Sequence, residues 1–187
     1  MTTAYDAPHD ELEGPYWNKT RLALSVVVIL IVAMWVWIYL FAPRTNPDRL
    51  ADRAFVAQAE SICAPFSAEI LALPRGNTAT TPTSRARQVE TGTNITRSMV
   101  DALEVAAASL EDPDDIKILE AWFEDWQAYL VDREAHVVKL DSAGPDTSAR
   151  DLAFTLTERA SGGIYTRRID GLANVNDMES CQVPRDV

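Results

Sequence analysis

Hydrophobic and polar residues follow two different patterns along this chain, one before residue 43 and one after it. The run LALSVVVILIVAMWVWIYLFA, residues 22–42, contains no charged side chain. At a rise of about 1.5 Å per residue, this run is about 30 Å long, which matches the hydrocarbon core of a bilayer. Residues that favour the water–lipid boundary flank it or lie near its far end: Tyr16, Trp17, Trp35, Trp37 and Tyr39. The pattern predicts a transmembrane helix over 22–42.

Two alternatives to a transmembrane helix are a buried core helix and a cleaved signal peptide. An uncharged run of this length is rarely the core helix of a soluble protein. The run is also longer than the core of a typical signal peptide, and APRTNP after it is a poor cleavage site. We therefore expect an uncleaved signal-anchor, with an acidic tail at 1–21 and a larger domain at 43–187.

Beyond the span, apolar residues recur at every third or fourth position, which is the period of an amphipathic helix. Asn46 and Pro47 form a helix-start signal, and the first predicted helix extends from there to Leu73. Further helices are predicted over about 84–110, 113–140 and 164–176, and residues 152–163 are expected to be extended or irregular. The predicted fold class is all-α, with one N-terminal transmembrane helix followed by a roughly four-helix antiparallel bundle.

The two cysteines, Cys63 and Cys181, lie on the same side of the predicted span and far apart in sequence. Their spacing is not typical of a metal site, and it indicates one disulfide. Because disulfides persist in oxidising compartments, this pairing places 43–187 outside the cytoplasm and the N-terminal tail inside it. Lysine and arginine residues stand on both sides of the span and do not decide its orientation. The alternative is two unrelated thiols in a cytoplasmic domain.

The charge of the chain limits its partners. With 28 acidic and 17 basic residues, the formal net charge is -11. A nucleic-acid-binding protein needs a basic face to displace counterions from phosphates, so we expect no nucleic-acid partner. The same balance argues against a polybasic membrane-surface patch. It favours a solvated acidic surface.

Motifs for catalysis or metal binding are missing from the sequence. His9 and His136 are the two histidines, and the acids nearest His136 do not share its helix face, so a solvated histidine is expected. The chain has no Glu-x-x-His pair, Cys-x-x-Cys-His motif, phosphate-binding glycine loop or nucleophile elbow. We therefore expect no catalytic residue, no metal and no cofactor.

Two groups of residues are candidates for binding. The first is a charged group that is either an interaction patch for a partner or anion, or a set of ion pairs that hold the last helix against the third: Arg133, Glu158, Arg159, Arg167, Arg168 and Asp170. The second is an aromatic group, Trp122, Phe123 and Trp126. This group forms either the wall of a ligand pocket or part of the core.

Three stretches of the chain carry a resemblance: ICAPFSAEILALP, AWFEDWQAYLVDREAH and RRIDGLANVNDMESCQVPRDV. With them the chain resembles small single-span membrane proteins of actinobacterial type, whose ending follows N-x-M-x-x-C-x-x-P-x-D-V. The resemblance covers most of the predicted outer domain and implies an extracytoplasmic helical fold. It agrees with pairing of Cys63 and Cys181, which stand in the first and last stretches, and it carries over no activity and no catalytic residues.

These observations lead to three hypotheses. The first is a non-enzymatic helical interaction domain, anchored in the bilayer, that binds another protein of the cell envelope. It predicts an exposed apolar or charged patch on the bundle. The second is a domain that binds a small ligand or lipid in a pocket between its helices. The third, an enzyme of another type, would need polar groups that converge in a cleft.

Overall fold

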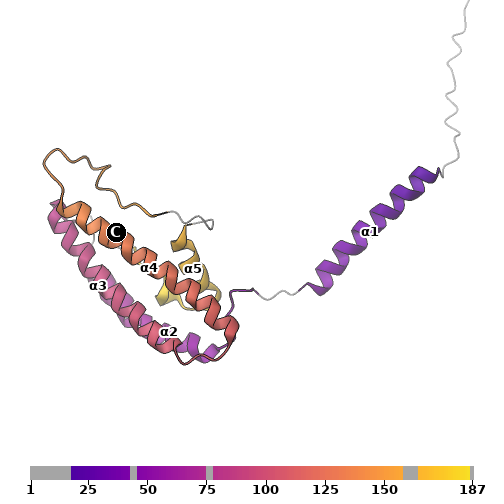
Figure 1. The fold of residues 1–187 in the computed structure, drawn as a ribbon, viewed down its shortest axis with the longest axis horizontal. Helices are drawn as coiled ribbons and strands as arrows, with labels where there is room; N and C mark the ends of the chain where they lie inside the picture. The colour runs from indigo at the N-terminus through magenta and orange to yellow at the C-terminus, as the bar shows by residue number, and fades with distance from the viewer. Residues whose placement is uncertain (1–17, 43–45, 75–77, 158–163, 186–187) are drawn as a thin grey trace, which may run out of the picture. The chain divides into compact units, whose positions relative to one another are not determined.

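The computed structural model describes residues 18–42, 46–74, 78–157 and 164–185, and it divides the chain into two compact units between Thr45 and Asn46. The first unit contains α1 (Lys19–Phe41), which Figure 1 labels. Every residue of α1 is exposed. Among the described residues, α1 is the one helix that is long and apolar enough to cross a membrane.

The second unit is built from helices, as predicted. They are α2 (Arg53–Ala72), α3 (Pro82–Ala107), α4 (Pro113–Asp141), α5 (Tyr165–Val175) and the short 3-10 helix η2 (Glu179–Cys181). The described part of the chain contains no β-strand. Residues 152–157 are irregular, as expected, and the rest of the predicted irregular segment lies outside the described residues. The structure thus confirms the all-α class.

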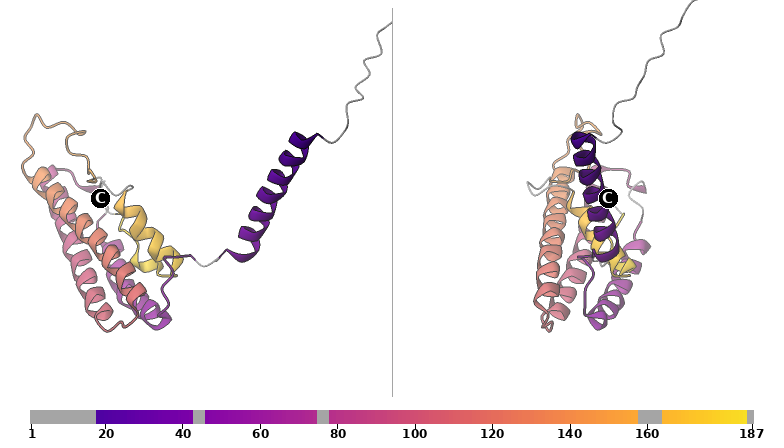
Figure 2. Two further views of the ribbon diagram at one scale, coloured as in Figure 1. Left: turned by 45° about the vertical axis from the view of Figure 1, so that its right-hand side comes forward. Right: turned by 90° about the vertical axis from the view of Figure 1, so that its right-hand side faces the viewer.

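The α3–α4 hairpin forms the long side of this unit, and Figure 2 shows the two helices side by side. Each helix begins with a capping side chain followed by a proline, which suits the first helical position because it lacks an N–H group. Side-chain contacts from Arg97 to Glu134 and from Gln127 to Glu104 join the hairpin in antiparallel register. The cap and proline at 112–113 predicted the start of α4 correctly, whereas α3 begins at Pro82, two residues before the predicted start at about 84.

The start of α2 differs from the prediction. The helix begins at Arg53, where the carboxylate of Asp52 accepts hydrogen bonds from two backbone N–H groups, and not at Pro47. The backbone N–H of Leu50 donates instead to Asn176 Oδ1 (2.9 Å). The N–H groups of residues 51 and 52 donate to the two carboxylate oxygens of Asp115, at 2.9 and 2.8 Å. Because distant side chains satisfy these donors, residues 46–52 form a turn and irregular backbone instead of a helix, and they lie against α4 and α5.

An apolar core lies among α2, α3, α4 and α5. Trp122, Trp126 and Tyr129 follow one face of α4, and successive rings meet edge to face with centroids 6.0 and 5.9 Å apart. Such contacts add to the stabilisation from burial of the rings. Buried apolar residues of α2, α3, α4 and α5 surround them: Phe55, Val56, Ala59, Val100, Leu103, Leu119, Ile169 and Ala173.

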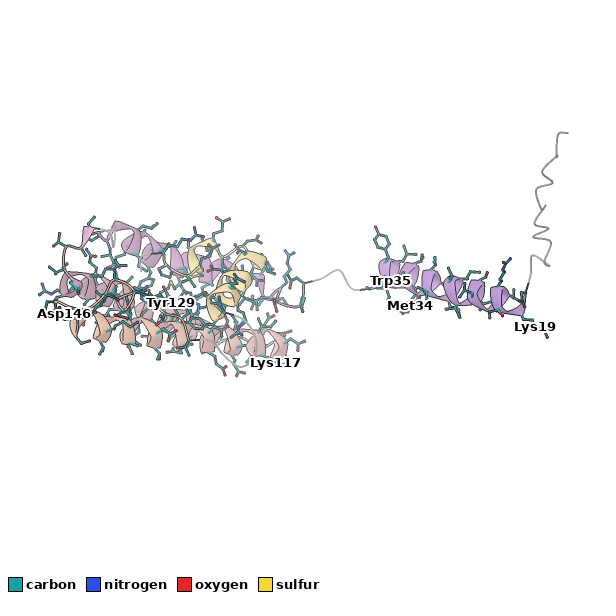
Figure 3. All side chains as sticks on the ribbon, turned by 90° about the horizontal axis from the view of Figure 1, so that it is seen from above. Lys19, Met34, Trp35, Lys117, Tyr129 and Asp146 are labelled. Carbon is teal, nitrogen blue, oxygen red and sulfur yellow. A yellow bond between two sulfur atoms is a disulfide. The ribbon has the colours of Figure 1, made fainter. Side chains whose placement is uncertain are left out.

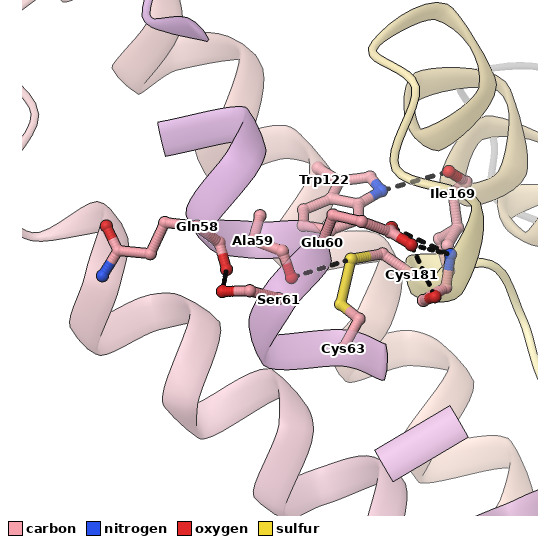
Figure 4. Close-up of a disulfide and its surroundings, with 9 residues drawn as sticks. Gln58, Ala59, Glu60, Ser61, Cys63, Trp122, Ile169 and Cys181 are labelled. Atoms are coloured by element: carbon pink, nitrogen blue, oxygen red, sulfur yellow. Dashed lines mark hydrogen bonds between the residues drawn. A yellow bond between two sulfur atoms is a disulfide. The ribbon is translucent and has the colours of Figure 1, made fainter. Parts of the chain in front are cut away.

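The predicted Cys63–Cys181 disulfide is present, with Cα atoms 5.2 Å apart and both residues fully buried (Figure 4). Beside it, the carboxylate of Glu60 accepts hydrogen bonds from the backbone N–H and the hydroxyl of Ser180, at 3.0 and 2.6 Å. The disulfide closes a loop with a sequence separation of 118. On the chain-entropy account, closure of such a loop stabilises the fold by about 4–5 kcal/mol.

The end of α5 directs Cys181 toward α2. Asp177 takes a left-handed conformation with φ of 61°. The N–H of Met178 donates to the carbonyl of Ala173 (2.8 Å), and the N–H of Asp177 donates to that of Asn174 (3.3 Å). This is the Schellman pattern, which satisfies the last helical carbonyls and reverses the chain. The chain then enters η2, which carries the cysteine.

Candidate functional site

A groove of about 650 Å³ runs along the seam between α4 and α5. Ile118, Ala121 and Trp122 of α4 and Gly171 and Leu172 of α5 form its apolar floor. Trp122 is only 3% exposed, so it presents little more than an edge to the groove. Its indole N–H donates to the carbonyl of Ile169 on α5 (3.2 Å), which holds the ring in place. Trp122 and Leu172 of the floor therefore belong to the packed core.

One end of the groove is basic. The guanidinium of Arg168 binds both carboxylate oxygens of Asp125, with Nε 2.7 Å from Oδ2. Asp125 is almost completely buried, and its hydrogen bond raises the pKa of Arg168 above the ordinary value. The pair is close to neutral in sum, so among the side chains that line the groove the exposed Arg167 gives this end its positive charge, while Glu124, outside the lining, is close enough to act on Arg168.

The other end of the groove is acidic. Asp114 and Lys117 from the first turns of α4 line this end, together with Asp48 from the segment before α2. All three side chains are exposed. Asn176 fixes this segment, because its amide donates to the carbonyl of Asp48 (2.9 Å). With two carboxylates and one ammonium group, this end carries a net negative charge, opposite to that of the Arg167 end.

The structure brings only part of the predicted charged group together. Arg167 and Arg168 line the same groove. Asp170 instead accepts a hydrogen bond from the backbone N–H of Val183 (2.8 Å), which ties down the C-terminal segment. The predicted residues Glu158 and Arg159 lie outside the described residues.

Arg133, the remaining member of the group, is fully buried between α3 and α4. Its Nε donates to Thr93 Oγ1 (2.8 Å), and its Nη1 donates to the hydroxyl of Tyr129 (2.9 Å). Its Nη2 donates to the backbone carbonyl of Val89 (3.3 Å). A buried guanidinium needs such partners to offset the cost of desolvation. Arg133 is therefore part of the interior and not of an exposed patch.

Asp132 was not among the predicted site residues. Its carboxylate accepts hydrogen bonds from the backbone N–H of Thr157 (2.6 Å), from the hydroxyl of Thr157 (2.7 Å) and from the hydroxyl of Tyr165. Burial, together with this carboxylate, raises the pKa of Tyr165 well above its ordinary value of 10.0. Asp132 thus holds both the loop before α5 and the first residue of α5 against α4.

The prediction of a solvated His136 was wrong. Its side chain is buried, with the residue 5% exposed, and its ring meets that of Phe154 edge to face at 5.2 Å. Burial, followed by the charges of Lys139, Arg85 and Arg133, lowers the pKa of His136 below 6.5. Nδ1 of His136 has no hydrogen-bond partner. Among the described residues, no group of three or more His, Cys, Asp or Glu could hold a metal ion.

The aromatic group does not line one cavity. Trp126 is fully buried, and its indole N–H has no hydrogen-bond partner. Trp122 lines the groove between α4 and α5. Phe123 lines a different cavity, of about 190 Å³, between α3 and α4. The three rings therefore serve mainly as core, and only Trp122 reaches the candidate site.

A comparison with protein-family models, with curated proteins and with solved structures finds no match to this chain. The class of the protein therefore follows from its own structure. It is a helical domain that a buried disulfide cross-links. A helix long and apolar enough to cross a membrane precedes it in the chain.

Proposed function

We propose that this protein is a membrane-anchored interaction domain of the cell envelope. In this proposal α1 spans the bilayer, the tail at 1–21 faces the cytoplasm, and the helical domain binds another envelope protein outside it. The proposal assigns no catalytic step, cofactor or nucleic-acid partner to the chain. It also agrees with the resemblance to single-span membrane proteins of actinobacterial type.

The observation that carries this proposal is the Cys63–Cys181 disulfide. Both cysteines are fully buried, and the bridge joins the first helix of the domain to its last turn. Structural disulfides of this kind persist in oxidising compartments. Because α1 precedes the domain and is apolar enough to cross a membrane, an oxidised domain supports an extracytoplasmic orientation.

The groove between α4 and α5 supports the binding role. It combines an apolar floor with charged groups of both signs at its ends. Apolar centres surrounded by polar rims are typical of protein interaction sites.

The orientation is tested by trapping thiols in intact cells with an alkylating reagent, followed by mass measurement with and without reduction. We expect no alkylation before reduction and two alkylated cysteines after it. Single cysteines are also introduced, one at the exposed Ala121 (Ala121→Cys) and, in a separate variant, one in the N-terminal tail. Labelling by a membrane-impermeant reagent then shows which of the two positions lies outside the cell. Two free thiols in the native protein, or labelling of the tail alone, would overturn the orientation.

The binding role is tested with a photo-crosslinking amino acid at Ala121, an exposed residue in the groove. Val105 on α3 is 77% exposed and lies outside the groove, so the same amino acid there is the matched control. We expect a defined adduct with one envelope protein from position 121 and none from position 105. Equal adducts from both positions would contradict a specific protein-binding groove.

A second candidate function is the binding of a small ligand or lipid. The volume of the groove lies within the range of small-molecule pockets, roughly 300–1,000 Å³, and Trp122 contributes an aromatic edge to its floor. Native mass spectrometry of the purified full chain tests this candidate. A bound molecule that Ala121→Trp displaces would favour it over protein binding.

A further inference from the structure

We infer that the α4–α5 groove binds an amphipathic helix of the partner, with an acidic residue against Arg167 and a basic residue against Asp48 and Asp114. This inference rests on the proposed function and names the form and charge of the partner segment. It follows from the backbone, the floor and the charges of the groove.

The backbone that borders the groove favours a helix over an extended strand. Both walls are helices, so their backbone N–H and C=O groups are bonded within α4 and α5 along the groove. An extended peptide would find no free sheet edge to extend, and its own backbone groups would lose water without gaining partners. A helix satisfies its own backbone and binds through side chains alone.

The floor of the groove has room for a helix to approach closely. Gly171 lies inside α5, and a Cβ built there would meet no side chain or other element within 4 Å. Glycine inside a helix costs about 1 kcal/mol relative to alanine, and the packing of this domain gives no reason for that cost. Ala121 is the small residue that α4 contributes to the same groove. Small residues at such positions let a third helix pack into the seam.

The length of the groove sets the size of the partner helix. Its α4 wall extends from Asp114 to Asp125. At about 1.5 Å per residue, this wall is about 16 Å long, or about three helical turns. The apolar face of the partner would then present side chains with the i, i+3, i+4, i+7 spacing to Ile118, Trp122 and Leu172.

The charges at the two ends select the partner and distinguish it from a lipid. Arg167 provides a positive charge beyond the neutral Arg168–Asp125 pair, whereas Asp48 and Asp114 outnumber Lys117 at the other end. An anionic lipid headgroup would match only the first end. A helix with an acidic and a basic end matches both, and complementary charges of this kind give specificity and orientation.

The test uses three designed amphipathic peptides of about 14 residues with the same apolar face. The first has one acidic and one basic end, the second two acidic ends and the third two basic ends. Fluorescence anisotropy measures their binding to the full chain in phosphatidylcholine nanodiscs. We expect the mixed peptide to bind tightest, with a loss of about threefold for a mismatched end, since exposed ion pairs are weak. With Arg167→Glu, the peptide with two basic ends should become the tightest binder.

Filling the groove gives the stronger test. Gly171→Leu should weaken the mixed peptide by more than about tenfold, which corresponds to about 1.4 kcal/mol. Gly144→Leu is the matched control, because this glycine lies in the turn after α4 and outside the groove. Circular dichroism checks that both variants fold.

Three outcomes would overturn the inference. They are equal affinities for the three peptides, equal binding by Gly171→Leu and Gly144→Leu, and undiminished binding of a mixed peptide with a central proline. Displacement of the mixed peptide by soluble short-chain phosphatidylglycerol at lower concentration than phosphatidylcholine would favour the lipid. These results leave the topology and crosslinking tests untouched, so failure of this inference is distinguishable from failure of the proposed function.

Discussion

The two halves of the helical domain differ in how much of their interior is apolar. Lys117 and Asp146 mark the two ends of the domain in Figure 3, with Tyr129 between them. The half toward Lys117 contains the disulfide and most of the apolar core, including Leu103 and Trp122. The half toward Asp146 has a much smaller apolar cluster of Ala86, Val89 and Leu140. In that half, the buried polar side chains of Asp132, Arg133 and His136 occupy much of the interior.

This difference means that the two halves should respond differently to mutation. Apolar packing tolerates changes that keep volume, because contacts with many neighbours share the stabilisation. A buried polar network depends on every partner, since one missing group leaves another desolvated and unpaired. We therefore expect the half toward Asp146 to be the more sensitive to conservative changes and to pH.

The largest effect is expected from removal of the disulfide. The double substitution Cys63→Ala and Cys181→Ala removes the bridge and should lower the free energy of unfolding by about 4–5 kcal/mol. Chemical denaturation of the full chain in nanodiscs measures this loss. Wild type under reducing conditions that open the bridge should lose a similar amount. A loss below about 1 kcal/mol would show that the apolar half is stable without the bridge.

The next effect concerns the buried guanidinium of Arg133. Arg133→Met keeps the length of the side chain but leaves the hydroxyl of Thr93 and the carbonyl of Val89 without this donor. Each hydrogen bond to a charged group contributes about 1.5–3 kcal/mol, so the loss of these bonds should lower the free energy of unfolding by about 3 kcal/mol or more. Arg97→Met removes a partly exposed contact with Glu134 and should cost less than about 1 kcal/mol. Urea denaturation of both variants compares them, and equal losses would contradict the assigned role of the polar interior.

A smaller and more local effect is expected from Asp132→Asn. The amide keeps the shape of the side chain but weakens the bonds from Thr157 and Tyr165 by removing the charge. Hydrogen bonds to charged groups contribute about 1.5–3 kcal/mol. Hydrogen exchange should accelerate in residues 150–157 and at the start of α5 before it does in α2. Asp146→Asn, at an exposed residue, is the control, and uniform acceleration over the whole domain would contradict the local role.

The smallest effect is a pH dependence from His136. Its pKa in the folded state lies below 6.5, so its stabilising contribution is complete above pH 6.5. As the pH falls through this value, the unfolded chain takes up a proton that the folded chain does not bind, and stability decreases. His136→Phe keeps an aromatic ring beside Phe154 but does not titrate. Between about pH 7.5 and about pH 5.5, wild type should lose more stability than this variant, and equal losses would contradict the assignment.

The apolar half was largely predictable from the sequence. The three- and four-residue spacing identified α3, α4 and α5, and the positions of Cys63 and Cys181 indicated the disulfide. The start of α2 was predicted wrongly because Asn46 and Pro47 have the local character of a helix cap. Distant acceptors on Asp115 and Asn176 override this local preference, and no local pattern reveals them.

The polar half and the groove were less predictable. His136 was predicted to be solvated because the acidic residues nearest to it in sequence do not share its helix face. Its burial depends instead on the packing of α3 and of Phe154 against it. The Arg168–Asp125 pair joins residues 43 positions apart. A sequence pattern showed that Arg167 and Arg168 concentrate charge, but only the fold shows which of them is neutralised.

The disulfide also determines how the domain carries mechanical load. The chain from Asn46 enters the domain along α4 and α5, and Cys63 is linked covalently to Cys181. Tension between the N-terminal side of the domain and its last residues would pass through 46–63, across the sulfur–sulfur bond and out through 181–185. Residues 64–180, which include α3, α4 and α5, lie outside that line of force. A pull between the two ends of the chain would therefore leave the α4–α5 seam unstretched.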